Sequence, residues 1–322
     1  MLWGPRIPPL PLASRDPSTA AMTAFRIGTR GSPLALTQAN MVRDALKAAH
    51  GIDGEIVVVR TTGDRVQDRP LAEIGGKALW TKELDRALLE GEIDCAVHSM
   101  KDVETIRPEA ITIAAMLPRA DVRDRLVGAE SLAALRPGAV IGTASPRRAA
   151  QVKRHRPDVT TVLFRGNVDT RLARLAAGEA DATLLASAGL DRLGRPDVGH
   201  ILPTNVMLPA PAQGAVGIEA RTGDTRTLAL IAAVDHPQTR ACVLAERAFL
   251  AALMADCHSP VAALATIEGA ILTIEAELYA EDGTAHVHGM IEGAPEDPML
   301  PAVLARDLLD RAPAAVRALF AG

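Results

Sequence analysis

The sequence is poor in aromatic residues. Only 2% of its 322 residues are Phe, Trp or Tyr, although 48% are hydrophobic. Its cores must therefore be built from aliphatic side chains. Few rings also leave few surfaces on which the bases of a nucleic acid could stack. The 35 Lys and Arg are outnumbered by 39 Asp and Glu, whereas general nucleic-acid binders are usually strongly basic. We therefore expect no nucleic-acid partner.

Cysteines and long apolar runs are also scarce. Cys95, Cys242 and Cys257 are far apart and odd in number, which suggests neither a disulfide framework nor a zinc site. Free cysteines suit a reducing cytoplasm. No apolar run approaches the ~20 residues of a membrane span, so no membrane partner is expected. Prolines interrupt residues 1–21, which excludes the apolar core of a secretory signal. We expect 1–21 to be a disordered leader, or the product of a start codon assigned too far upstream.

The rest of the chain alternates between strand and helix patterns. Strand patterns at 24–29, 55–64 and 93–100 are separated by helix patterns at 32–50 and 75–92. The same alternation, with turns between, recurs over 139–194, where the last strand runs into a turn. Residues 208–221 are too rich in Pro and Gly for a helix and fit a segment that returns the chain to the first domain. A helix at 239–260, an antiparallel meander at 265–293 and a closing helix at 299–320 follow.

This order of elements predicts an α/β fold. We expect two similar α/β domains that flank a cleft, plus a small C-terminal α+β domain. The predicted boundaries are 22–117 with 210–234 for domain 1, 118–209 for domain 2, and 235–322 for domain 3, which carries Cys257.

Polar residues gather where the predicted strands end. Arg30 and Ser32 follow one strand, the stretch from His98 to Asp102 follows another, and Arg147 and Arg148 lie beyond a third. Ligands of open α/β sheets bind outside the carboxyl ends of the strands. Helix N-termini attract anions, and arginine forks suit carboxylates or phosphates. The pattern predicts a cleft for a small polyanion.

Each of these signals has an ordinary structural alternative. A single arginine at a helix start is usually solvated, and a lone histidine such as His98 is more often a hydrogen-bonded structural residue. Cys95 and Cys242 lie in apolar patterns and are expected in the core. Cys257 lies in a predicted loop, where a thiol is either reactive or incidental. The stretch "GGKALWT" has Ala78 where a phosphate-binding loop needs Ser or Thr, and no G-x-G-x-x-G opens a helix.

Longer motifs resemble one enzyme family. They are "RIGTRGSPLALTQA" (26–39), "IGGKALWTKELDRALLEGEIDCAVHSMKDV" (74–103), "IGTASPRRAAQ" (141–151), "FRGNVDTRLARL" (164–175), "ASAGLDRLG" (186–194), "LPAPAQGAVGIEAR" (208–221) and "AERAFLAALMADCHSPVAA" (245–263). In this order they resemble the hydroxymethylbilane synthases, also called porphobilinogen deaminases. The family's fold has two periplasmic-binding-protein-like domains. The family's Gly-Gly before the cysteine is replaced by Ala255-Asp256, and its usual Pro after Lys-Asp-Val by Glu104.

The resemblance implies a transferase that joins four porphobilinogen molecules head to tail, releases ammonia and forms a linear tetrapyrrole for heme biosynthesis. It implies a dipyrromethane cofactor bound to Cys257 through a thioether, and no metal. Asp102 is the implied catalytic carboxylate. The residues implied to contact the cofactor are Lys77, Trp80, Ser99, Lys101, Thr143, Ser145, Arg147 and Arg148. Those implied to contact the substrate are Arg30, Ser32, Arg165, Arg171 and Arg192. A monomer is expected.

Two other functions compete with this one. A two-domain anion-binding module would share the architecture but would need neither Asp102 nor a modified Cys257. A nucleic-acid binder could use the basic stretch 145–156, although the acidic net charge and the scarcity of aromatics disfavour it. The mass of the intact chain distinguishes the enzyme from the binding module, because only the enzyme carries extra mass on Cys257.

Overall fold

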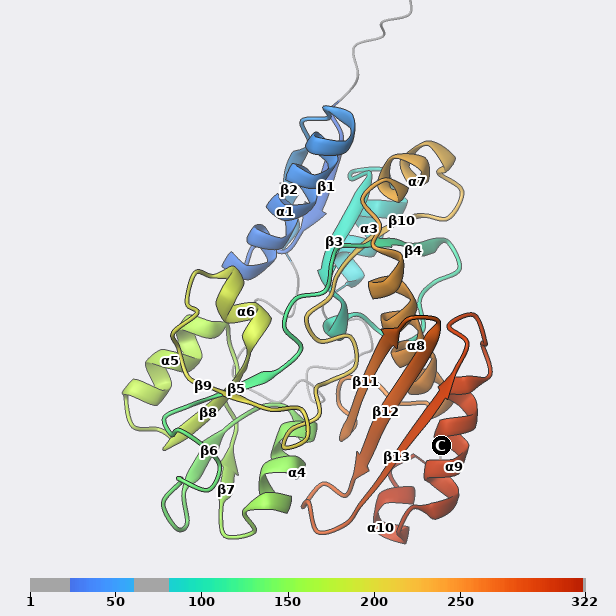
Figure 1. Cartoon of the computed structure of the whole chain (residues 1–322). Helices are drawn as coiled ribbons and strands as arrows, with labels where there is room; N and C mark the ends of the chain where they lie inside the picture. The colour runs from blue at the N-terminus through green and yellow to red at the C-terminus, as the bar shows by residue number, and fades with distance from the viewer. Residues whose placement is uncertain (1–23, 61–80, 321–322) are drawn as a thin grey trace, which may run out of the picture.

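The computed structural model describes residues 24–60 and 81–320. Its first layer is a five-stranded sheet in the order β2-β1-β3-β10-β4 (Figure 1). The strands are β1 (Arg26–Thr29), β2 (Glu55–Val58), β3 (Cys95–Ser99), β4 (Ile111–Met116) and β10 (Val216–Arg221). β2, β1 and β3 run parallel, and β10 is antiparallel to both of its neighbours. The helices of this domain are α1 (Pro33–His50), α3 (Lys82–Leu89) and α7 (Thr225–Ala232).

The second five-stranded sheet repeats this arrangement. Its order is β7-β6-β8-β5-β9, with the first three strands parallel and β5 antiparallel to both of its neighbours. The strands are β5 (Asp124–Val127), β6 (Val140–Gly142), β7 (Thr160–Val162), β8 (Ala182–Ala186) and β9 (His200–Leu202). The helices are α4 (Pro146–His155), α5 (Val168–Ala176) and α6 (Ser187–Arg192). β1 and β6 therefore hold equivalent places, as do β3 and β8.

A small domain at the C-terminus packs helices on an antiparallel sheet. Strands β11 (Val261–Glu268), β12 (Ile271–Tyr279) and β13 (His286–Gly293) form a meander. Helices α8 (Pro237–Ala252), α9 (Leu300–Arg311) and α10 (Ala314–Arg317) complete the domain (Figure 1). Its core joins Phe249 of α8 to Ile274 of β12 and Leu308 of α9, all fully buried. The predicted fold class, two similar α/β domains and a small α+β domain, is confirmed.

Two crossing segments connect the two five-stranded sheets. Residues 117–123 lead from β4 to β5, and residues 203–215 return the chain from β9 to β10. Both are tied to α8 by the carboxylate of Glu246, which is fully buried. It accepts two hydrogen bonds from Arg119, at 2.7 and 3.0 Å, and one from the backbone amide of Ala212. A buried carboxylate that is paired and hydrogen-bonded in this way fixes the crossing segments against the third domain.

Most predicted elements appear, with shifted ends. Ser32 caps α1 as expected, and its Oγ accepts from the amide of Ala35. The sequence patterns missed strands β4, β5, β9 and β10 and helix α7. The strands are defined by pairing with segments elsewhere in the chain and not by a local pattern. The turn expected after 186 is helix α6. The single closing helix was wrong: Pro313 separates α9 from α10, because proline cannot continue a helix.

Cys95 and Cys242 are buried, as predicted. The predicted leader 1–21, the last part of the strand predicted at 55–64 and the first part of the helix predicted at 75–92 lie outside the described residues. No helix in the described segments is both long and apolar enough to span a bilayer.

Candidate active site

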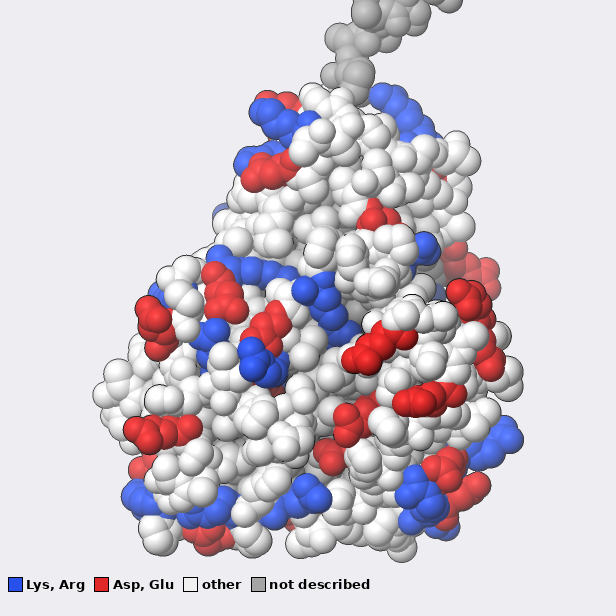
Figure 2. Space-filling view, viewed as in Figure 1, with Lys and Arg blue, Asp and Glu red and all other residues white. Residues whose placement is uncertain are grey.

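A cavity of about 660 Å³ lies where the three domains meet. Its wall is formed by the segments that follow β1, β3, β6 and β8, by the returning crossing segment, and by the loop after α8. On the face shown in Figure 2, basic and acidic side chains are interspersed, and several basic ones lie along the seam between the upper and lower-left domains. The sequence predicted that the polar strand ends would face one cleft, and the cavity bears this out.

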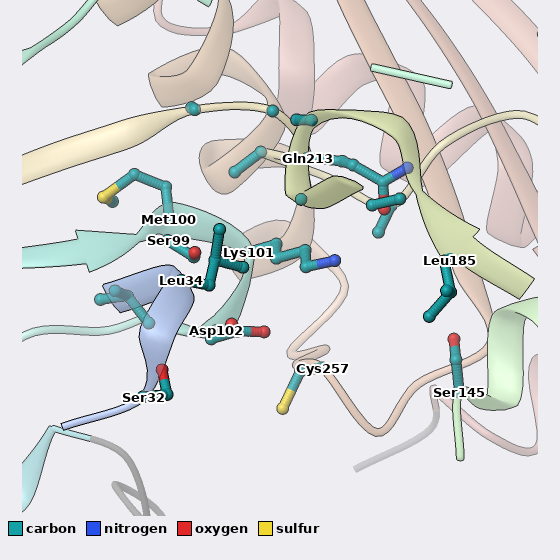
Figure 3. Close-up of a pocket in the computed structure, with 18 of the residues that line it drawn as sticks. Ser32, Leu34, Ser99, Met100, Lys101, Asp102, Ser145, Leu185, Gln213 and Cys257 are labelled. Atoms are coloured by element: carbon teal, nitrogen blue, oxygen red, sulfur yellow. The ribbon is translucent and has the colours of Figure 1, made fainter. Parts of the chain in front are cut away.

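The first domain supplies Asp102 and Lys101 on one tight turn. β3 ends at Ser99, and a single 3₁₀ turn, Met100–Asp102, follows. The buried Met100 side chain anchors this turn against β10, where a Cβ on Gly217 would lie 2.0 Å from its sulfur. Only glycine allows that approach. As Figure 3 shows, the side chains of Lys101, Asp102 and Cys257 extend into the same space.

The environment changes the acidity of Lys101. Removal from water lowers the pKa of its ammonium group to about 8, although the Asp102 carboxylate opposes this shift. Desolvation disfavours the charged form. A bound carboxylate would favour the charged form again, so Lys101 is suited to an anionic ligand.

Cys257 lies in the loop that follows α8. The loop is closed by Asp256, whose carboxylate accepts from the amide of His258 at 2.8 Å and whose amide donates to Ser259 Oγ at 3.1 Å. Cys257 is solvent-exposed within the cavity. The protein atoms packed around the sulfur, and the negative charges of Asp102 and Asp256, raise the pKa of the thiol to about 12. The group is therefore a neutral thiol at pH 7.

The second domain faces the cavity with the start of α4. Ser145 caps this helix and accepts from the amide of Arg148 at 3.4 Å, the equivalent of Ser32 at α1. Arg147 and Arg148 begin the helix and are both buried. Their guanidinium groups bond the two oxygens of Asp124 at 2.8 and 2.7 Å. Burial alone would raise the pKa of Asp124, but the two arginines outweigh it and hold that pKa below its usual range.

Three further arginines of the second domain line the cavity. Arg165 follows β7, Arg171 lies on α5, and Arg192 ends α6. Arg171 donates to the carbonyl of Gly166 at 3.0 Å, and burial followed by repulsion from Arg148 lowers its pKa to about 10. Arg192 donates to the carbonyl of Gly214 at 2.7 Å, and burial lowers its pKa too.

The remaining expected residues are placed as follows. Arg30, Ser32 and Ser99 line the cavity, and Ser99 Oγ accepts from Gln38 at 2.7 Å. Thr143 is buried at the end of β6, just outside the cavity wall, and its Oγ1 accepts from the amide of Ser145. Lys77 and Trp80 lie outside the described residues.

Sequence reasoning missed the carboxylates that support the site. Asp124 opens β5, and Glu219 lies on β10 with Oε2 3.1 Å from His98 Nε2 and Oε1 2.8 Å from Arg107 Nε. Burial would raise the pKa of Glu219, yet the bonds from His98 and Arg107 lower it to about 2. The bonding partners of each carboxylate are distant in the chain, so no local sequence pattern predicts its role.

The cleft has the donors that a polycarboxylate needs. Among the described residues, the buried Nε atoms of Arg147, Arg148 and Arg192 have no hydrogen-bond partner. The arginines that line the cavity are cationic forks, and such groups bind carboxylates through several charge-assisted bonds. An exposed thiol in the same cavity provides a point of covalent attachment. The residues present therefore fit a dipyrromethane with acidic side chains. Within the described segments, no three His, Cys, Asp or Glu side chains are grouped to hold a metal ion.

Comparison with solved structures finds distant likeness. The methionine-binding protein MetQ is 11% identical, with a TM-score of 0.41 over 65% of this chain and 88% of that chain. The periplasmic sulfonate-binding protein SsuA from Methylobacillus flagellatus KT is 17% identical, with a TM-score of 0.36 over 71% of this chain and 69% of that one.

Comparison with known sequences finds close relatives. The model of the "porphobilinogen deaminase, dipyromethane cofactor binding domain" matches residues 25–229, and that of the "porphobilinogen deaminase, C-terminal domain" matches 240–309. The porphobilinogen deaminase of Sphingopyxis alaskensis is 57% identical over 306 residues, which cover 92% of this chain and 96% of the relative. That of Paracoccus denitrificans is 50% identical over 298 residues, covering 90% and 95%. The chain belongs to the porphobilinogen deaminase family.

Proposed function

We propose that this protein joins four porphobilinogen molecules head to tail, releases ammonia and yields the linear tetrapyrrole hydroxymethylbilane, a precursor of heme. The observation that carries the proposal is the shared cavity of Asp102 and Cys257. A binding module would need neither a carboxylate facing a thiol nor a thiol open to modification. The family to which the chain belongs supports the same activity.

Asp102 is the proposed catalytic carboxylate. Porphobilinogen must lose its amine to become a cationic, azafulvene-like electrophile. A carboxylate at the reacting carbon assists in two ways: it accepts a hydrogen bond from the protonated amine, which leaves as ammonia, and it stabilises the positive charge that remains on the pyrrole. The 3₁₀ turn holds Asp102 at a fixed place at the end of β3. A rigidly held carboxylate needs little reorganisation during the reaction.

The cationic residues of the cavity are proposed to bind the acetate and propionate groups. The proposed substrate contacts are Arg30, Ser32, Arg165, Arg171 and Arg192, and the proposed cofactor contacts that line the cavity are Ser99, Lys101, Ser145, Arg147 and Arg148. Thr143, just outside the cavity wall, is proposed as a cofactor contact from the family resemblance alone. Lys77 and Trp80 complete the proposed set from the family resemblance alone. Ser32 and Ser145 cap the helices whose N-termini point toward the cavity, where free amide groups favour anions.

Cys257 is proposed to carry the dipyrromethane through a thioether. The bound cofactor supplies the pyrrole terminus to which substrate units are added. A thiol with a pKa of about 12 is almost entirely protonated at neutral pH.

The proposed organisation keeps the divisions expected from the sequence: 22–117 with 210–234, 118–209, and 235–322. We also propose a monomer. A cytoplasmic location agrees with three free cysteines.

The mass of the purified intact protein tests the proposal. We expect extra mass equal to two pyrrole units, its loss in Cys257→Ser, and its retention in Cys242→Ser, the matched control. Porphobilinogen should be consumed by the wild type and by Cys242→Ser, but not by Cys257→Ser. A bare wild-type chain that binds porphobilinogen without consuming it would instead identify an anion-binding module.

A further inference from the structure

The turn that carries Asp102 is bonded directly to the loop that carries Cys257. Thr105, three residues after Asp102, donates from Oγ1 to the carbonyl of Ala255 at 2.8 Å. Ala255 lies two residues before Cys257 and is only 4% exposed. A hydrogen bond to a buried carbonyl in these surroundings is sheltered from competing water. It links the first domain to the third within a few residues of both reactive side chains.

Arg247 makes a second connection between the same two segments. It lies on α8, the helix that leads into the Cys257 loop, and is 6% exposed. Its Nη1 donates to the carbonyl of Val103 at 3.2 Å, and its Nη2 donates to the carbonyls of Glu104 and Thr105. Three successive carbonyls are thus held by one planar guanidinium, whose rigid fork suits several acceptors at once.

The Asp102 turn is fixed on its other side as well. Arg107 bonds Glu219 on β10, Asp85 on α3 and Glu104, which lies two residues after the turn. Glu104 Oε2 also accepts from Thr81 Oγ1 at 2.7 Å. The turn is therefore part of the first domain's framework. Thr105 and Arg247 therefore connect the third domain to a segment that is itself held in place by the first domain.

We propose that Thr105 and Arg247 are positioning residues that hold the Cys257 loop at a fixed place relative to Asp102. The inference rests on the proposed function, in which both side chains serve one reaction. Successive condensations then take place at a constant geometry between the carboxylate and the point of attachment. The space that added units require comes from the cavity and from the second domain, not from displacement of the cysteine loop. A misplacement of 1 Å at a reacting centre can cost about a hundredfold in rate.

Thr105→Val tests this proposal, because valine keeps the shape of threonine and lacks the hydroxyl donor. In the holoenzyme we expect cofactor mass to be retained, KM to stay within about twofold, and kcat to fall about tenfold or more. Thr105→Ser should restore kcat. Amide hydrogen exchange in 253–259 should be faster in Thr105→Val than in Thr105→Ser, a readout that does not depend on turnover.

Thr222→Val is the matched control. Thr222 Oγ1 also donates to a backbone carbonyl at 2.8 Å, that of Glu109, but outside the cavity lining. We expect it to leave kcat and exchange in 253–259 unchanged. Arg247→Lys, which keeps a charge but loses the fork, should lower kcat in the same direction as Thr105→Val.

Two results would overturn the inference. One is a holoenzyme of Thr105→Val with wild-type kcat and wild-type exchange in 253–259. The other is equal loss in Thr105→Ser and Thr105→Val, which would mean that the hydroxyl is not the active feature. Failure of the proposed function is a separate outcome, since the wild type itself would then lack cofactor mass and turnover. The exchange comparison would still report on the link between the two segments.

Discussion

Asp124 provides the most demanding test of the electrostatic structure of the cleft. Its side chain is fully buried. Oδ2 accepts from Arg147 at 2.8 Å, while Oδ1 accepts from Arg148 at 2.7 Å and from Gln213 at 2.9 Å. Asp124→Asn keeps the shape and removes the charge. In either orientation the new amide nitrogen faces an arginine donor, so at least one hydrogen bond becomes a repulsion between donors.

The expected loss of stability follows from this geometry. Two buried guanidinium groups would face a neutral amide in place of their shared counter-charge, and breaking a buried ion pair by removing one partner costs about 3–5 kcal/mol. An unfolding entropy of about 2.1 cal/mol/K per residue means that ~1 kcal/mol lowers the Tm of a 322-residue chain by roughly 1.5 °C, so the expected fall is roughly 4–7 °C. Arg147 and Arg148 also line the cavity, so their displacement should weaken binding of carboxylates.

Calorimetry of the wild type and of Asp124→Asn measures the fall in Tm, and initial rates at a series of porphobilinogen concentrations measure KM. Asp307→Asn is the control, because Asp307 forms an exposed pair with Arg311; surface pairs contribute little. A Tm for Asp124→Asn within about 1–2 °C of the wild type, roughly the shift of a surface substitution, would refute the reasoning. The buried pair would then contribute no more than the exposed one.

Four further predictions address the site and its supports. Asp102→Asn should keep the cofactor mass and lower kcat by about a hundredfold or more, because one preorganised charge is lost; a rate within a fewfold of the wild type would move the catalytic role elsewhere. If the charge of Lys101 binds carboxylates, kcat/KM should fall as pH rises through about 8, and Lys101→Arg should move that limb to higher pH. Arg171→Lys should raise KM about tenfold through loss of a charge-assisted bond, which initial-rate measurements check against an unchanged Tm. Glu219 has its pKa lowered from 4.5 to about 2 in the folded state, so its contribution to the free energy of unfolding is complete above pH 4.5 and is lost as pH falls toward 2; acid unfolding of Glu219→Gln should lack that component.

Local sequence patterns were sufficient for much of the fold. Ser32 and Pro33 mark the start of α1, and the apolar spacing of Ala39, Val42 and Leu46 marks its buried face. These features act over a few residues and are visible in any short window. The strands β4, β5 and β9 were missed for the converse reason. Each is defined by pairing with strands that come from elsewhere in the chain.

The candidate site likewise has some features that the sequence indicates and others that only the structure shows. Motifs around Asp102, Cys257 and the arginines indicate the family, and the strand–turn–helix pattern indicates that several of these residues face one cleft. Nothing in the sequence indicates that Thr105 bonds the backbone beside Cys257, because Thr105 and Ala255 are 150 positions apart in the chain. Nor does it indicate that Asp124 neutralises Arg147 and Arg148.

The sequence by itself determined the types of element, their order and the chemical groups available to the cleft, because helix caps, periodicity and residue chemistry are local properties. Only the tertiary structure decided which of those groups are paired, how far burial shifts the pKa values of Lys101 and Cys257, and which contacts connect the carboxylate to the thiol. These properties depend on desolvation and on charges brought within a few ångströms by folding, and both are set by residues far apart in the chain.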